Sequence, residues 1–218
     1  MSIVPTLDGF IAFIRNQMGI SAQYLPDSSD DISTAYNLSL AQVNVFFARI
    51  TGSLYQLMVY NLAADILINI AQDYRVGISH IYWTAGVATV ITSTPNTFVT
   101  GNVVSIVGAV PVGYNVSAMA TISNPTYLTL PIPTNPNAYI LGGTIGFNLF
   151  ETLRSNWHLN NFVGGVIQES HDETTGETIA VPDAIKQATL NDLQLFKTPY
   201  GRFYLQYAQK LGTAWGIS

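Results

Sequence analysis

The chain has 218 residues and a formal net charge of −5, and only 10% of its residues are charged. This length suits one large domain or two small ones. A negative chain without a Lys/Arg-rich run lacks the positive surface that grips nucleic acid, and the absence of cysteine excludes disulfides, thiolate nucleophiles and cysteine-ligated zinc. Weakly charged copies also repel one another little, which favours an assembly subunit.

The distribution of apolar residues predicts neither a signal peptide nor a membrane-spanning helix. Residues 1–10 lack a basic segment followed by an apolar core, so no signal peptide is expected. The most apolar stretch, 54–71, is interrupted by polar residues and falls short of the uninterrupted apolar run of about 20 residues that spans a membrane. We therefore expect a protein made in a reducing cytoplasm.

Three helices are predicted before the first strand. Thr6 can cap a short helix that ends near residue 18. A second helix is predicted from about 29 to 50, because apolar residues recur there at steps of three and four and so share one face. A third helix runs from about 53 to 72, and Gly52 before it predicts an antiparallel hairpin of the two.

The second predicted helix is apolar on its opposite side as well. A helix that is apolar on two sides is buried between neighbours, either in its own domain or in an adjacent subunit. The opposite side carries Leu38, Ala41, Val45 and Ala48. We assign the first three of these residues, together with Trp215 near the carboxyl end, to an interface with a partner.

A gap in charge separates the two halves of the chain, because no Lys, Arg, Asp or Glu lies between Arg75 and Glu151. Short Val/Ile/Thr-rich strands are predicted inside the gap at 87–92, 102–106, 117–122 and 126–130, with Gly and Pro between them. This pattern predicts a small all-β barrel or sandwich over 84–146, inserted into a helical domain of 1–83 and 147–218.

The last part of the chain is predicted to hold three helices and an arm. One helix covers about 148–156, another begins at Thr189, and the last has Thr198 as its cap and Pro199 at its first position. The stretch 158–182 is long for a structureless loop, which favours an extended arm that reaches a neighbouring component, with a surface hairpin as the alternative. Its carboxylates, assigned to a partner interface, are Glu169, Asp172, Glu173 and Glu177.

No reaction chemistry is predicted. None of the three histidines has the spacing of a metal-binding motif, and no nucleophile elbow or phosphate-binding loop occurs. His171 beside Asp172 could bind a cation, but a solvated acidic loop is the alternative. Glu151 and Glu169 could form a glycosidase pair, yet nothing in the sequence brings them together. We therefore expect no enzyme, no catalytic residue, no metal ligand and no cofactor.

Two sets of segments resemble proteins of tailed phages. Residues 101–115, GNVVSIVGAVPVGYN, resemble the G-[DN]-x-V-x-I-x-G-x-x-P-x-G-Y-N pattern of small β modules in phage structural proteins. Residues 59–64, VYNLAA, resemble a segment in the helical hairpin of phage neck proteins. Residues 161–167, 181–184, 189–194, 197–202 and 207–216 resemble the same family, the head-to-tail connector or adaptor proteins.

The resemblance implies a structural virion protein that assembles in the host bacterial cytoplasm. Its fold would be α+β, with an adaptor-like helical bundle, the inserted β module and the extended arm. Copies would form a ring of about twelve subunits that contacts the portal protein and tail or collar proteins. Genomic DNA would pass through the lumen without sequence-specific binding, and a ring of negative subunits suits a conduit in which DNA slides.

Two other functions stay open. A different tail or baseplate protein could use the β module to bind a partner or a host glycan, through the aromatic residues Tyr114, Tyr127 and Tyr139 that we expect to be exposed. Against this, sugar sites commonly place a carboxylate or an arginine beside the aromatic ring, and the module has neither. A hydrolase that uses Glu151, Glu169 or His171 is the third hypothesis.

Overall fold

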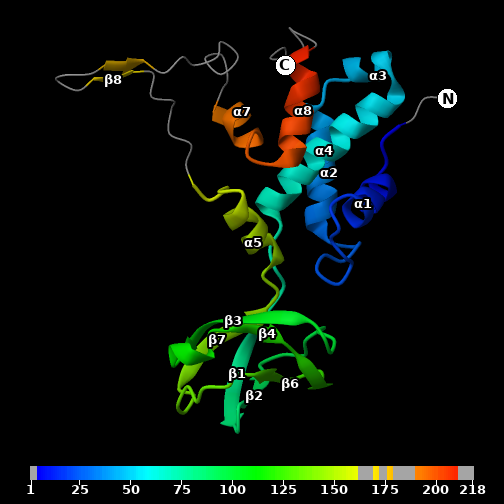
Figure 1. Ribbon diagram of the computed structural model, residues 1–218. Helices are drawn as coiled ribbons and strands as arrows, with labels where there is room; N and C mark the ends of the chain where they lie inside the picture. Colours follow the sequence, from blue (N-terminus) through cyan, green and yellow to red (C-terminus); the bar gives the residue numbers. More distant parts are fainter. Residues whose placement is uncertain (1–3, 162–168, 172–175, 179–189, 211–218) are drawn as a thin grey trace. The chain divides into compact units, whose positions relative to one another are not determined.

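The computed structural model describes residues 4–161, 169–171, 176–178 and 190–210. The chain is mixed helix and sheet and divides into two compact units (Figure 1). The helical unit consists of Met1–Ala71 and Leu153–Ser218, and the sheet unit consists of Gln72–Thr152. Among the described residues, no helix is both long enough and apolar enough to cross a membrane.

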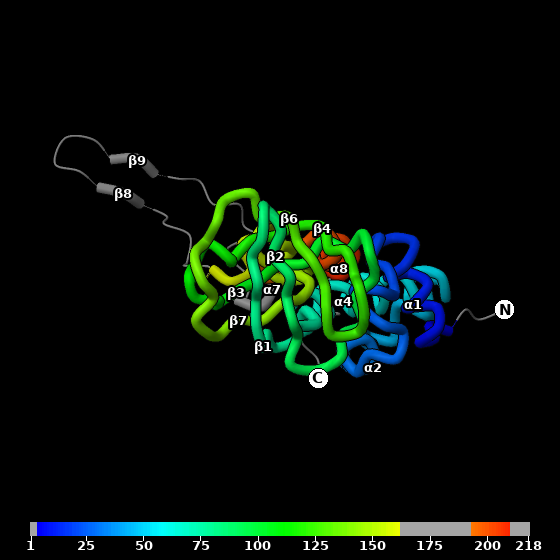
Figure 2. The backbone as a smooth tube through the Cα atoms, turned by 90° about the horizontal axis from the view of Figure 1, so that it is seen from below, coloured from blue at the N-terminus to red at the C-terminus, as the bar shows by residue number. Residues whose placement is uncertain are grey.

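The sheet unit is a nearly closed antiparallel barrel of seven strands in the order β4-β3-β7-β1-β2-β6-β5. Figure 2 shows β3, β7, β1, β2 and β6 following one another. The edge strands β4 and β5 are consecutive in the chain and only Ala120 separates them, so this corner nearly closes the barrel. The strands are β1 (Arg75–Thr84), β2 (Val87–Thr92), β3 (Val103–Val110), β4 (Ser117–Met119), β5 (Thr121–Asn124), β6 (Tyr127–Pro131) and β7 (Leu141–Gly146).

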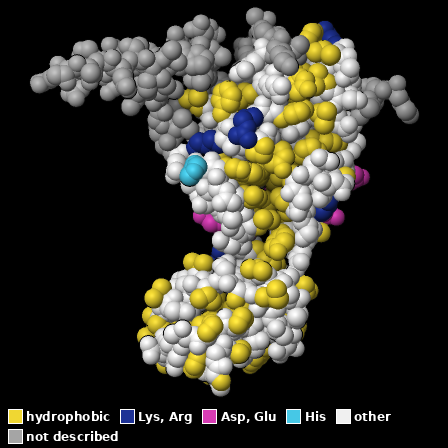
Figure 3. All heavy atoms as spheres, in the orientation of Figure 1, with side chains coloured by type: hydrophobic (Ala, Val, Ile, Leu, Met, Phe, Trp, Pro, Cys, Tyr) yellow, Lys and Arg dark blue, Asp and Glu magenta, His cyan; other side chains and the backbone are white. Residues whose placement is uncertain are grey.

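The sheet unit begins earlier than the charge gap predicts. β1 starts at Arg75 and pairs with both β2 and β7, so the predicted boundary at residue 84 would remove a central strand. The sequence pattern missed β1 because Arg75 and His80 interrupt its apolar run, and it missed β7 because Gly142 and Gly143 lie within it at positive φ. The face of the barrel seen in Figure 3 carries hydrophobic and uncharged polar side chains, as the charge gap requires.

The helical unit is built around α4, whose middle turns are almost completely buried. α2, α3 and α8 all pack against it. The predicted caps Thr6 and Thr198 are confirmed, since their hydroxyl oxygens accept hydrogen bonds from the amides of Gly9 and Gly201. The helices are α1 (Leu7–Asn16), α2 (Asp30–Gln42), α3 (Phe46–Ile50), α4 (Gly52–Ile70), α5 (Leu149–Asn156), α7 (Leu190–Leu195) and α8 (Pro199–Lys210).

The single helix predicted over 29–50 is two helices in the structure. Val43 is extended, with φ −73° and ψ 122°, and ends α2. The Asn44 side chain then accepts a hydrogen bond from the Phe46 amide at 2.8 Å. Short polar side chains that bond to nearby backbone amides offer the chain an alternative to a continuous helix. The apolar period continued through Asn44, so periodicity alone could not reveal this break.

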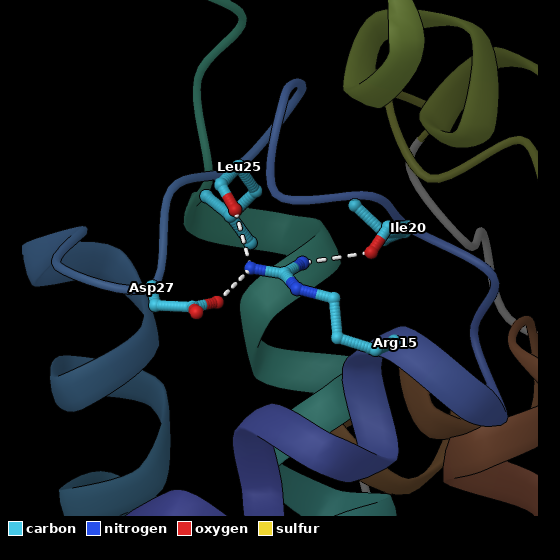
Figure 4. A network of polar contacts seen from close by, with 4 residues as sticks. All are labelled: Arg15, Ile20, Leu25 and Asp27. Atoms are coloured by element: carbon cyan, nitrogen blue, oxygen red, sulfur yellow. Dashed lines mark hydrogen bonds and ion pairs between the residues drawn. The ribbon is translucent and has the colours of Figure 1, made fainter.

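Arg15, near the end of α1, fixes the loop that leads to α2 (Figure 4). Its guanidinium donates to the Ile20 carbonyl at 2.7 Å and to the Leu25 carbonyl at 2.6 Å, and it also pairs with Asp27. The Arg15 side chain is 20% exposed, whereas that of Asp27 is 60% exposed. The two carbonyl bonds therefore stabilise the loop more than the ion pair does.

We expect Arg15→Ala to lower the free energy of unfolding by about 2 kcal/mol, because two partly buried carbonyls lose charged donors. Asp27→Ala is the matched control and should cost less than about 1 kcal/mol, since it removes only an exposed ion pair. Urea unfolding of both variants measures the difference. Equal losses would show that the ion pair, not the carbonyl bonds, holds the loop.

Candidate functional site

An apolar surface is left uncovered on the helical unit around α3. Val43 and Phe47 point inward and are buried, which fixes α3 against α4, while neighbouring apolar side chains face outward. Figure 3 shows hydrophobic side chains gathered over the part of this unit that carries α3 and α4. We name as the α3 patch the five exposed residues Leu38, Val45, Phe46, Ile50 and Leu57.

The α3 patch continues the second apolar side that the sequence predicts for 29–50. The buried side of α2, which includes Ile32 and Tyr36, packs on α4. Leu38, Ala41 and Val45 lie on the other side and are exposed, Val45 at 65%. Among the described residues, α4 thus covers one of the two apolar sides, and Leu38, Ala41 and Val45 on the other side stay exposed.

Arg49 lies in α3 among these apolar side chains. The structure describes the side chains of five other Arg and Lys residues, and all five make polar contacts: Arg15, Arg75, Arg154, Lys197 and Arg202. Arg49 alone makes no hydrogen bond or ion pair with any described residue and is exposed. Its charge is therefore available to a partner, and sequence reasoning did not single it out.

A pocket with a volume of about 510 Å³ opens on the second half of α4. The Asp65 carboxyl lies in its wall, together with the amide side chains of Gln42, Asn69 and Gln194. Apolar side chains complete the lining: Leu62, Ile66, Ile70, Leu159, Leu195 and Tyr204. This combination suits a ligand with a polar, hydrogen-bond-donating head on an apolar stem.

Asp65 is 6% exposed and has one side-chain partner among the described residues. The Thr198 hydroxyl donates to Oδ1, while Thr198 also caps α8 by accepting from the Gly201 amide at 2.8 Å. Oδ2 accepts no hydrogen bond from the described residues, and Asp65 lines the pocket. Asp65 and Asn61, two of the polar residues that interrupt the apolar stretch 54–71, are both buried.

Burial raises the pKa of Asp65 to about 6, and the hydrogen bond from Thr198 opposes this rise only in part. The ordinary value is about 3.9. Between these two pH values the folded monomer holds a proton that the unfolded chain has lost, so the free energy of unfolding falls as pH rises through the window. The loss is complete above about pH 7, where it amounts to about 3 kcal/mol.

We expect Asp65→Asn to stabilise the monomer above pH 7 by about 2–3 kcal/mol, because the amide carries no charge and its oxygen still accepts from Thr198. The gain should shrink steadily as the pH falls from 6 to 4. Urea unfolding of dilute wild-type and variant protein across pH 4–8 measures it. A constant difference between the two curves would show that the Asp65 charge is not the cause.

The sheet unit carries an aromatic cluster on β1 and the segment before β7. The ring of His80 lies 4.3 Å from that of Tyr82 and 5.2 Å from that of Tyr139, between ring centroids. Tyr82 is 58% exposed. Tyr114, which the sequence predicted to be exposed, is 1% exposed and donates a hydrogen bond to the Asn137 carbonyl at 2.8 Å. That prediction was wrong, because the 3-10 turn Val112–Tyr114 directs the ring into the barrel.

The remaining predicted interface residues lie outside the described part of the structure. Residues 172–175 and 211–218, which include Asp172, Glu173 and Trp215, are not described. The backbones of Glu169 and Glu177 belong to β8 (Glu169–His171) and β9 (Gly176–Thr178), an antiparallel pair within the predicted arm, but their side chains are not described. Glu151 lies in the first turn of α5, and the described residues contain no cluster of His, Cys, Asp or Glu able to hold a metal ion.

No family model and no curated protein matches this chain. The resemblance to phage connectors therefore depends on the segments quoted for it. The α3 patch with Arg49 and the pocket with Asp65 are two surfaces of different chemistry on one compact unit. Two unlike surfaces suit head-to-tail association of copies, whereas a single self-complementary patch suits a two-fold dimer.

Proposed function

We propose that this chain is a structural virion protein whose copies form a ring between the portal at the head vertex and the tail. The observation that carries the proposal is the uncovered α3 patch, on the side of α2 that faces away from α4. Single exposed apolar residues are ordinary, but a contiguous group of them marks a contact with a partner. The low charge of the chain leaves copies free to approach one another.

In this proposal the helical unit is the adaptor-like part that builds the ring. The sheet unit is the inserted module, and the arm with Glu169, Asp172, Glu173 and Glu177 reaches a basic surface of the portal or of the next ring. DNA passes through the lumen of about twelve subunits. Their net negative charge, −5 for each chain, keeps DNA from binding tightly.

A second candidate function belongs to the sheet unit, as the binding module of another tail or baseplate protein. The cluster of His80, Tyr82 and Tyr139 favours it, since exposed aromatic rings stack on sugar rings. The His80 imidazole can also form a hydrogen bond with a sugar hydroxyl. The charge-free module offers no carboxylate or arginine for this purpose. Tyr82→Ala would abolish such binding and leave a ring intact.

Negative-stain images of the purified chain mixed with the portal protein of the same phage distinguish the two. We expect a ring stacked on the portal and no binding to a glycan array. The ring proposal is wrong if portal particles stay unchanged while glycans bind in a way that Tyr82→Ala abolishes. Hydrolysis of a glycan that Glu151→Ala abolishes would instead support the enzyme hypothesis.

A further inference from the structure

The chain buries one carboxylate, that of Asp65, and no opposite charge pairs with it among the described residues. Asp65 is 6% exposed and its side chain accepts one hydrogen bond, from a neutral hydroxyl, within the described residues. Among the described residues, no ion pair joins it to an Arg or Lys side chain. A buried carboxylate is costly unless a cation or several donors satisfy it. A protein that retains such a group at the wall of an open pocket gains from it when a cation enters.

The lining of the pocket identifies the kind of cation. The amide oxygens of Gln42, Asn69 and Gln194 can accept hydrogen bonds beside the Asp65 carboxylate. A guanidinium has five donors in one plane, so it can bind a carboxylate through two bonds and still donate to amides. The apolar lining residues, such as Ile66 and Leu195, suit the methylene stem of an arginine.

The chain itself presents such a group. Arg49 is exposed on α3 and makes no polar contact with the described residues, while the α3 patch surrounds it with Val45, Phe46 and Ile50. Apolar side chains around a charged group exclude water from the contact that it forms. Arg49 precedes the first residue of α4, and about 20 Å of helix separates that end from Asp65, so it cannot reach the pocket of its own chain. Figure 1 shows α3 beside the N-terminal part of α4.

We propose that Arg49 of one copy enters the Asp65 pocket of the next copy, with the α3 patch packed around the entrance. The contact deepens the proposed ring and rests on it. It joins two different surfaces of the same unit, so it repeats from copy to copy and closes into a ring when the rotation allows. It also explains why Arg49 and Asp65 both have no charged partner among the described residues of the unit.

The absence of cysteine makes a direct test available. Ala48→Cys and Asn69→Cys place single thiols on α3, beside Arg49, and at the exposed rim of the pocket, so that Arg49 and Asp65 both stay in place. The two variants are mixed in equal amounts at high concentration and treated with a short bis-maleimide that spans the distance between neighbouring thiols. We expect a cross-linked pair that contains one chain of each variant, and little product from either variant alone. The double variant should give a ladder that ends at one closed size.

Val112→Cys, on an exposed residue of the sheet unit, is the control and should cross-link with Asn69→Cys only at background level. A second measurement uses charge alone: Arg49→Glu should weaken association at least about tenfold, and Arg49→Lys should restore part of it. The contact is wrong if Ala48→Cys links mainly to itself, or if its yield with Asn69→Cys matches the control. If a ring still forms in either case, the proposed function stands and only this contact fails; if no association occurs under any condition, both fail.

Discussion

Val45→Glu should abolish assembly of the chain while leaving the folded monomer intact. Val45 is 65% exposed and belongs to the α3 patch, so the substitution places a charge in the middle of the proposed contact. An unpaired charge buried at each contact should raise the dissociation constant at least about 100-fold, which corresponds to about 3 kcal/mol. The monomer should be unaffected, because a carboxylate at the first end of a helix is favourable and Val45 makes no side-chain cap for α3.

Sedimentation velocity across a concentration series measures this effect, with urea unfolding as the check on monomer stability. Leu38→Glu, at the α2 side of the patch, should behave in the same way. Val112→Glu is the matched control, since Val112 is 78% exposed but belongs to the sheet unit. If Val112→Glu disrupts assembly as strongly as Val45→Glu does, the α3 patch is not the specific contact surface.

Gly201→Ala should be the most destabilising single methyl addition in the helical unit. A methyl group on Gly201 would overlap with the Leu195 carbonyl oxygen and lie 2.8 Å from Asp65 Oδ1. Both neighbours are held in place, the first by the turn between α7 and α8 and the second by the Thr198 hydroxyl. α8 would have to move away from α4, so we expect a loss of about 3 kcal/mol in the free energy of unfolding.

Gln206→Ala is the control for Gly201→Ala, because it also introduces alanine into α8 but at an exposed position. Its effect should stay within about 0.5 kcal/mol. Thermal unfolding followed by circular dichroism compares the two. If Gly201→Ala unfolds at the same temperature as the wild type, α8 does not pack on α4 as closely as the structure has it.

Local signals in the sequence predicted elements whose ends are set by their own residues. Thr6, Thr198 and Pro199 predicted helix starts correctly, because caps depend on a few neighbouring atoms. The strand at 87–92 matches β2, since its alternation and its flanking turns are local as well. β1 was missed because Arg75 and His80 interrupt its apolar run, although its partner β2 follows it directly. The partners of β7, which are β1 and β3, lie far away in the sequence, and no local pattern records which distant segments will pair.

In the candidate site as well, the sequence pointed to residues with a local signal and missed those that depend on tertiary packing. The two apolar sides of the segment 29–50 predicted that Leu38, Ala41 and Val45 would meet a neighbour, and these residues are exposed in the single chain. Asp65 could not be recognised, because its burial depends on where α7 and α8 pack against α4. Arg49 was overlooked because a lone arginine in a helix is ordinary. It is distinct only in the structure, where the other described Arg and Lys side chains make polar contacts with described residues and Arg49 makes none.

The ring that we propose closes through the helical unit of the chain. Native mass spectrometry of the wild-type chain bound to the portal protein of the same phage, beside Val45→Glu, tests it most directly. We expect one closed stoichiometry of about twelve copies for the wild type, and free monomer for Val45→Glu. A wild-type chain that stays monomeric, forms a two-fold dimer or adds copies without a fixed end would contradict the claim.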